Sequence, residues 1–135
     1  MTEYNTCYQK LKCYDWRMLD KKKIKEKLEI ERDTLLEELR DMGKLDPDTG
    51  EWEATPEEIT SPQADENDKA DRFENFEARS SMIRTLEPRL NAILKALKSL
   101  NRDSFGKCEV CKEDIEAARM EANAAARTCK KHLED

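Results

Sequence analysis

The chain has 135 residues, of which 41% are charged and 37% hydrophobic, with a net charge of -6 and a mean hydropathy of -0.99. So polar a composition excludes a thick globular core and favours long helices that each bury one stripe of side chains. No apolar stretch is long enough to cross a membrane, and no signal peptide is visible. Five cysteines without a secretion signal predict a cytoplasmic protein whose thiols bind metal instead of forming disulfides.

The first 17 residues hold several aromatic side chains and two cysteines without a helical period, so we interpret 1–17 as an N-terminal extension. A start of translation at Met18 would leave this extension out of the protein. Cys7 and Cys13 are separated by five residues, a spacing that is atypical of a metal-binding pair, and no nearby pair completes them. We therefore expect no metal site in this segment.

A first helix is predicted over 20–42, where apolar residues recur at three- to four-residue spacing. These residues are Ile24, Leu28, Leu35, Leu39 and Met42. Gly43 is expected to end the helix. Residues 44–64 are expected to be a connection, with turn chemistry over 46–50 and a short helix that begins after a capping box at 55–58. Trp52 is expected to pack this loop onto the helices, with a contact to a partner as the alternative.

A second helix is predicted from about 66 to 104, where apolar residues step by seven, three and four, as in a coiled-coil seam. The seam consists of Phe76, Ile83, Leu86, Leu90, Ile93, Leu97 and Leu100. Pro88 removes one backbone hydrogen bond and is expected to kink or locally break this helix. We predict an all-α fold in which residues 18–104 form an antiparallel two-helix coiled-coil hairpin, with its tip near 65–70, and residues 105–135 form a small zinc finger.

Four residues near the C-terminus have the spacing of a zinc site, C-x2-C-x17-C-x2-H, and these are Cys108, Cys111, Cys129 and His132. Tetrahedral Zn²⁺ accepts thiolates and imidazole in this mixture, and four protein ligands close its shell. We therefore predict one structural zinc ion per chain, with free or disulfide-paired thiols as the alternative. A closed shell leaves no position for water, and no nucleophile stands beside a base, so we do not expect an enzyme.

Charge is unevenly distributed along the chain. Residues 46–80 contain 12 acidic and 3 basic residues, whereas the segment from Phe105 onward contains 7 acidic and 6 basic residues. A zinc finger that reads duplex DNA needs cationic contacts to phosphates, so we expect no sequence-specific DNA binding. The acidic middle segment indicates a basic protein surface, a cation-lined channel or a metal ion as its partner.

Two segments have recognisable motifs. Residues 105–111, FGKCEVC, have the form aromatic-Gly-x-Cys-x-x-Cys, and residues 65–70, DENDKA, have the form D-x-x-D-x-A and begin 43 positions before Cys108. Together they resemble the DksA/TraR family of zinc finger proteins, whose finger starts with the first motif and whose tip carries the second. Residues 115–122 resemble that family's segment between the ligand pairs. The resemblance covers about residues 65–133.

The resemblance implies a cytoplasmic bacterial transcription regulator that binds RNA polymerase instead of promoter DNA, and we expect it to be a monomer. It implies that the helical hairpin enters the secondary channel, that the finger braces it from outside, and that tip carboxylates act near the catalytic centre. The tip residues are then Asp68, Asp65 and the small Ala70, which permits close approach. The alternative for this motif is a solvated acidic helix start in which Asp65 is the N-cap. The alternative hypothesis is a zinc-braced helical adaptor that binds another protein and has no transcriptional role.

The chain departs from the family pattern at several positions. His132 replaces the usual fourth Cys, which is acceptable because imidazole is a sound zinc ligand. Ala124 stands where a Pro is common in the finger loop. Members that respond to guanosine tetraphosphate carry basic residues between hairpin and finger, where this chain has Ala92, Asn123 and Leu133, so we expect no such response.

Overall fold

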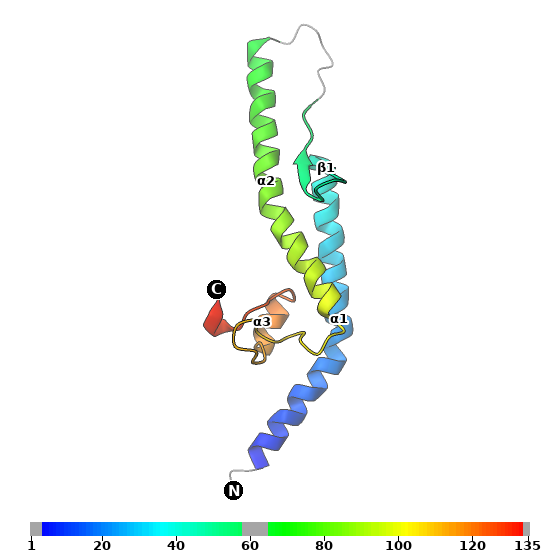
Figure 1. The fold of residues 1–135 in the computed structure, drawn as a ribbon, viewed down its shortest axis with the longest axis vertical. Coiled ribbons are helices and arrows are strands. Elements are labelled where there is room, and N and C mark those ends of the chain that lie inside the picture. The colour runs from blue at the N-terminus through cyan, green and yellow to red at the C-terminus, as the bar shows by residue number, and fades with distance from the viewer. Residues whose placement is uncertain (1–3, 58–64, 134–135) are drawn as a thin grey trace. The chain divides into compact units, whose positions relative to one another are not determined.

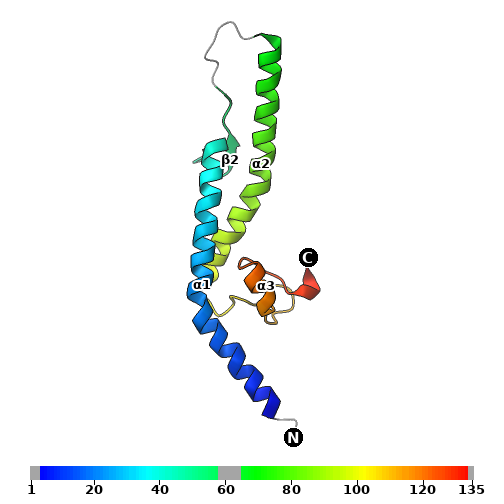
Figure 2. The same cartoon turned by 180° about the vertical axis from the view of Figure 1, so that it is seen from behind.

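The computed structural model describes residues 4–57 and 65–133, with side chains from residue 21 onward. Its elements in chain order are helix α1 (Tyr4–Met42), strands β1 (Gly43–Leu45) and β2 (Trp52–Ala54), helix α2 (Glu66–Ser99), helix α3 (Ala117–Ala122) and a short 3-10 helix η1 (Lys130–His132) (Figure 1; β2 is labelled in Figure 2). The contacts between residues divide the chain into two compact units. We call Met1–Glu31 with Ile93–Asp135 the finger unit, and Arg32–Ala92 the strand unit.

The described chain is mostly helical, but the strand pair corrects the all-α prediction. In the strand unit β1 and β2 form an antiparallel ladder in which Gly43 pairs with Ala54 and Leu45 pairs with Trp52. Three-residue strands are too short to show the alternating pattern by which strands are recognised in a sequence. The backbone N–H of Trp52 donates to Glu87 Oε1 at 3.4 Å, which ties the strand pair to α2.

The predicted turn over 46–50 joins the two strands. The backbone N–H of Gly50 donates to the carbonyl oxygen of Asp46 at 2.8 Å, and Gly50 has a φ of 73°, which suits glycine. The Asp46 carboxylate accepts the backbone N–H of Asp48 at 2.8 Å and the hydroxyl of Thr49 at 3.0 Å. These two hydrogen bonds lower the pKa of Asp46. The connection is therefore an ordered hairpin turn.

Helix α1 begins at Tyr4, so the prediction that the first helix starts at residue 20 was wrong. Residues 4–19 contain no Gly or Pro, and helix formation there needs no amphipathic period. From residue 21 the predicted stripe is confirmed, because Ile24 and Leu28 are buried in the finger unit, and Leu35 and Leu39 are buried in the strand unit. The helix ends at Met42, as predicted.

Helix α2 begins at Glu66, as predicted, and continues through Pro88 without a break. It ends at Ser99 and not at 104, and is followed by turns in which the N–H of Arg102 donates to the carbonyl oxygen of Ser99 at 2.8 Å. The buried seam residues are Ile83, Leu90, Ile93 and Leu100. Coiled-coil pairing of this seam with α1 stays a prediction.

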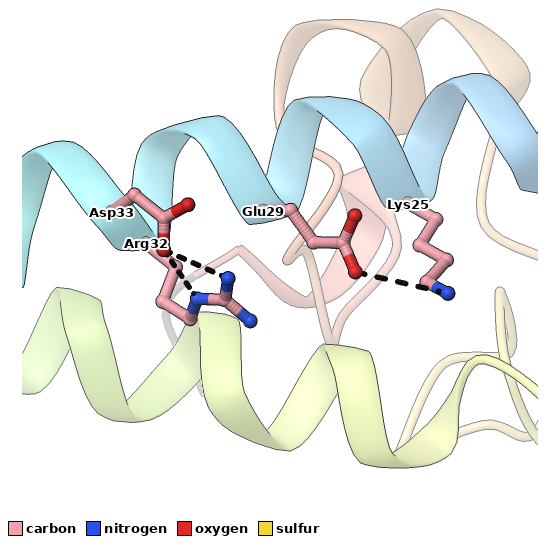
Figure 3. Close-up of polar contacts among 4 residues, drawn as sticks. All are labelled: Lys25, Glu29, Arg32 and Asp33. Carbon is pink, nitrogen blue, oxygen red and sulfur yellow. Dashed lines mark hydrogen bonds and ion pairs between the residues drawn. The ribbon is translucent and has the colours of Figure 1, made fainter.

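Helix α1 carries two ion pairs (Figure 3). In the finger unit Lys25 Nζ lies 3.7 Å from Glu29 Oε1, one helical turn onward. In the strand unit the Arg32 guanidinium lies 2.8 Å from Asp33 Oδ1. An i,i+4 pair such as Lys25–Glu29 contributes about 0.3–0.5 kcal/mol, so it supports the helix without deciding what the helix packs against.

Two expectations concern residues at the edge of the described chain. Residues 55–57 are not helical, and the rest of the short helix expected after the capping box falls in 58–64, outside the described residues. The proposed extension 1–17 is described only as helical backbone from Tyr4 onward. Among the helices that the structure describes, none is long and apolar enough to cross a membrane.

Gly43→Ala should destabilise the strand unit by about 1–3 kcal/mol, because overpacking against rigid backbone cannot be relieved by a rotamer change. A Cβ at this position would lie 2.1 Å from the carbonyl oxygen of Glu53 and 3.0 Å from Ile83 Cδ1. Thermal denaturation followed by circular dichroism measures the loss. Lys44→Ala, at an exposed position of the same strand, is the control. Equal melting temperatures for the two variants would contradict the close approach at Gly43.

Candidate metal centre

The first ligand pair lies on a tight turn after α2. The backbone N–H of Lys112 donates to the carbonyl oxygen of Cys108 at 3.0 Å, and the N–H of Cys108 donates to the carbonyl oxygen of Glu113 at 2.8 Å. Lys112 adopts a left-handed φ of 61°, which turns the chain back directly after Cys111. This turn brings the Cys108 and Cys111 thiols to the same side of the loop.

The second ligand pair lies at η1. The backbone N–H of His132 donates to the carbonyl oxygen of Cys129 at 3.0 Å, closing one turn that brings both side chains together. The two turns are joined directly, because the N–H of Glu109 donates to the carbonyl oxygen of Arg127 at 2.9 Å. This backbone hydrogen bond holds the segment that leads to the second ligand pair beside the turn that carries the first pair.

The four predicted ligands meet at one point. Their ligand atoms all lie within 4.8 Å of one another. Cys111 Sγ and Cys129 Sγ are 3.8 Å apart, and His132 Nδ1 lies 3.2 Å from Cys129 Sγ and 3.8 Å from Cys108 Sγ. Zn–S bonds of about 2.3 Å in a tetrahedron place two sulfurs about 3.8 Å apart, and a sulfur and a nitrogen about 3.5 Å apart. The donor set and its spacing fit zinc, with His132 binding through Nδ1.

The ligand thiols differ in acidity. Burial opposes the Cys108 thiolate, but backbone N–H donors, including those of Cys111 and Cys129, outweigh it and lower the pKa of Cys108 to about 6. The hydrogen bond between Cys129 and His132 lowers the pKa of the thiol and raises the pKa of the imidazole. For Cys111 the backbone N–H of Glu113 favours the thiolate, yet burial and the neighbouring thiols raise its pKa. A metal ion would hold all three as thiolates.

Helix α3 holds the second ligand pair in place. Arg119 Nε donates to the carbonyl oxygen of Thr128 at 2.7 Å, and Arg119 Nη2 reaches the Thr128 hydroxyl at 3.4 Å. The Glu116 carboxylate accepts the backbone N–H of Lys130 at 3.1 Å. Thr128 and Lys130 flank Cys129, so both side chains position a ligand without touching the metal. Sequence reasoning noticed this segment as a family resemblance but missed this role.

A small apolar cluster encloses the ligands from within the finger. Its buried members are Cys108, Ile115, Met120 and Cys129, and Phe105, Cys111 and Ala126 pack against it. The loop with Ala124 in place of a proline is closed by Asn123, whose side-chain Oδ1 accepts the N–H of Ala125 at 3.1 Å. Ala124 and Ala125 are both buried, so the finger is packed there without a proline ring.

Arg119→Ala is expected to weaken zinc binding about 10- to 100-fold, the usual range when a partner that orients a ligand is removed. The reason is that Thr128, next to Cys129, loses the donor to its carbonyl oxygen. Competition with a chromophoric chelator measures the affinity. Arg119→Lys keeps the charge but can supply only one donor group, so it should fall between the alanine variant and the unchanged protein. Unchanged zinc affinity of Arg119→Ala would refute the positioning role.

The predicted tip residues lie far from these ligands in sequence and begin α2. Asp65 Oδ1 accepts the backbone N–H of Asn67 at 2.5 Å and of Asp68 at 3.2 Å, and Asp68 Oδ2 accepts the N–H of Asp65 at 3.3 Å. This reciprocal arrangement is a helix N-cap. Asp65, Asp68 and Ala70 are all exposed. Both carboxylates therefore have a structural role as well as access to a partner.

Comparison with known proteins agrees with this geometry. Residues 103–131 match the prokaryotic dksA/traR C4-type zinc finger. No curated protein matches the chain. The structure of transcription factor DksA2 from Pseudomonas aeruginosa is similar, with a TM-score of 0.54 and 20% identity, over 87% of this chain and 79% of that chain. At that identity the likeness concerns the fold.

The matched segment ends at residue 131, one position before His132, and the geometry supplies this fourth ligand. Three cysteines and one histidine therefore stand where the family description has four cysteines. Imidazole and thiolate are interchangeable in structural zinc sites. The resemblance predicted from the sequence is confirmed for the finger, because residues 103–131 match the model of the prokaryotic dksA/traR C4-type zinc finger.

Proposed function

We propose that this chain is a bacterial transcription regulator that binds RNA polymerase and has no catalytic activity of its own. One combination carries the proposal: a DksA/TraR-type finger lies downstream of an acidic turn, 65–70, that begins a long helix. The similar Pseudomonas aeruginosa structure is described as a transcription factor, which supports the same class of role. A cytoplasmic, monomeric protein suits this role.

The proposed mechanism uses the helices for reach. The 34 residues of α2 extend about 50 Å at 1.5 Å per residue. A coiled-coil hairpin of that length would enter the secondary channel of the polymerase, while the finger would remain outside as a brace. The zinc ion would have no chemical role beyond holding four ligands together, because they leave no position for water.

The tip would act through charge. Asp65 and Asp68 are exposed, and their mutual capping fixes them at the first turn of α2. Carboxylates held there would influence Mg²⁺ and basic groups at the catalytic centre, where electrostatic complementarity affects specificity and rates. Ala70, two residues after Asp68 in α2, is small enough to permit close approach.

A second candidate is the zinc-braced adaptor without a transcriptional role. The observation that favours it is the capping geometry, because helix capping alone accounts for acidic residues at 65 and 68. An adaptor would bind through its helical faces, and its partner would be insensitive to the tip. Binding to polymerase separates the two candidates.

The test is photo-crosslinking of the zinc-loaded protein to core RNA polymerase. A photoreactive residue in place of Ala70 is expected to label polymerase segments near the catalytic centre. One in place of the exposed Lys130, on the finger, is expected to label the outer surface. Failure of the folded protein to bind polymerase would favour the adaptor. Labelling of the outer surface from position 70 would contradict channel entry even if binding occurs.

A further inference from the structure

Arg79 holds residues 55–57, which we call the strap, on one face of α2. Its Nη1 donates to the carbonyl oxygen of Thr55 at 3.1 Å, and its Nη2 lies 2.6 Å from Glu57 Oε1. The strap follows β2 directly, and the backbone N–H of Thr55 donates to the carbonyl oxygen of Met42 at 3.1 Å. One arginine thus binds the strap through its backbone and through a side chain.

Within the described residues, Arg79 makes the polar contact of α2 that lies nearest to the tip. It stands on the seam face, three residues after Phe76 and four before Ile83. Across the described ranges 4–57 and 65–133, residues 66–78 form no hydrogen bond or ion pair with another element. At 1.5 Å per residue, the strap is therefore fixed to α2 about 20 Å from the start of this helix.

The strap carries a helix-start signal that the structure does not use. Thr55 has the pattern of an N-cap, with Pro56 at the first helical position and a glutamate three residues after Thr55. In a helix that began there, the Thr55 carbonyl oxygen would accept the first intrahelical hydrogen bond, and the glutamate would bond the Thr55 N–H. Both groups are instead engaged by Arg79 and Met42. Residues 55–57 are accordingly not helical.

We propose that Arg79 is a latch that switches the strap between two states. In the latched state Arg79 holds Thr55 and Glu57 on α2, and in the released state the capping box begins a helix at Pro56. The side chains of Arg79 and Glu57 are 31% and 38% exposed, so salt or a competing charged group can reach the latch. Pro62 would end such a helix within two turns, so the released strap is only partly helical.

The switch would change how the chain reaches the tip. Asp65 follows Glu57 by eight residues. An extended chain covers about 3.3 Å per residue and a helix 1.5 Å, so the two states differ in the length of chain available to the tip. This consequence rests on the proposed function of the tip, whereas the latch is a property of the isolated chain. The latch is therefore tested without polymerase, and a failure to bind polymerase would refute the proposed function alone.

Nuclear magnetic resonance of the zinc-loaded full chain tests the latch in Arg79→Ala. The Thr55 amide should exchange with solvent at least about tenfold faster than in the unchanged protein, because the charged contact that holds the strap is lost. The carbon chemical shifts of Pro56 and Glu57 should at the same time move toward helical values. Faster exchange reports release, and the shifts report the second state.

Two references separate release of the strap from a general loss of stability. The Gly50 amide, which donates to the carbonyl oxygen of Asp46 in the preceding turn, should exchange at nearly the same rate in Arg79→Ala. Arg84→Ala removes an exposed arginine from the same helix and should behave like the unchanged protein. Glu57→Gln removes one charge but keeps an oxygen acceptor, so it should accelerate Thr55 exchange less than Arg79→Ala.

A second substitution tests the capping box itself. Thr55→Val in the Arg79→Ala protein removes the hydroxyl that would cap the helix and should cancel the helical shift of Pro56 and Glu57. Equal Thr55 exchange in Arg79→Ala and Arg84→Ala would overturn the proposal. Faster exchange of a strap that stays extended, or a helical shift that persists in Thr55→Val, would overturn it as well.

Discussion

Removal of zinc should unfold the finger, residues 105–133, while most of α1 and α2 stays helical. The finger holds a small apolar cluster around the ligands, and so little burial cannot order a segment of this length by itself. Structural zinc contributes on the order of 10 kcal/mol in finger peptides, which makes this the largest effect expected for the chain. Chelator titration, followed by amide resonances of the finger and by far-ultraviolet circular dichroism, measures both parts of the prediction.

Variants of His132 sharpen this test, because its Nδ1 lies beside two thiols. His132→Cys restores the family's usual four-cysteine set and should keep zinc tightly bound. His132→Ala leaves three ligands and should lose more zinc affinity than Arg119→Ala. A folded finger in protein that contains no zinc, or unchanged affinity in His132→Ala, would contradict the four-ligand site.

Leu90→Glu should destabilise the strand unit by several kcal/mol. Leu90 is 3% exposed, and a carboxylate placed there would lose its hydration without a partner. Thermal denaturation followed by circular dichroism should show a large fall in the melting temperature. Phe73→Glu is the matched control, because Phe73 lies on the same helix and is 65% exposed. Its effect should stay within about 0.5 kcal/mol.

If the two glutamate variants melted alike, Leu90 would not belong to a packed seam. That outcome would also weaken the predicted coiled-coil hairpin, because the hairpin depends on burial of the same stripe. A fall in melting temperature seen only in Leu90→Glu would support a packed seam. Distance measurements would then identify the helix that packs against it.

The periodic parts of the fold could be predicted from the sequence. The apolar positions of α1 recur at helical spacing, and Leu28 and Leu39 are indeed fully buried. The zinc ligands were predictable for a different reason, since short Cys and His spacings report a local turn and need no knowledge of the fold. The structure brings those four side chains together as predicted.

Features that depend on contacts between distant residues could not be predicted. Gly43 was expected only to end a helix, but its missing Cβ also lets the carbonyl oxygen of Glu53 approach, which requires the strand pair. The role of Arg119 depends on Thr128, nine residues away, across the finger.

The tip assignment for Asp65, Asp68 and Ala70 stays a prediction. The capping geometry allows a test that separates the charge of Asp68 from its role in the helix cap. Asp68 Oδ2 accepts the backbone N–H of Asp65, and an asparagine oxygen can accept the same hydrogen bond. Asp68→Asn therefore removes the charge while keeping the helix cap. Asp71→Asn, at an exposed position of the same helix, is the matched control.

The most direct measurement of the central claim is the lifetime of promoter open complexes with RNA polymerase and each of these two variants. Asp68→Asn is expected to bind polymerase within a few-fold of the unchanged protein, yet to lose most of its effect on that lifetime. Asp71→Asn is expected to retain the effect. An Asp68→Asn protein that binds polymerase and alters open-complex lifetime as strongly as the unchanged protein would contradict a tip that acts through its charge.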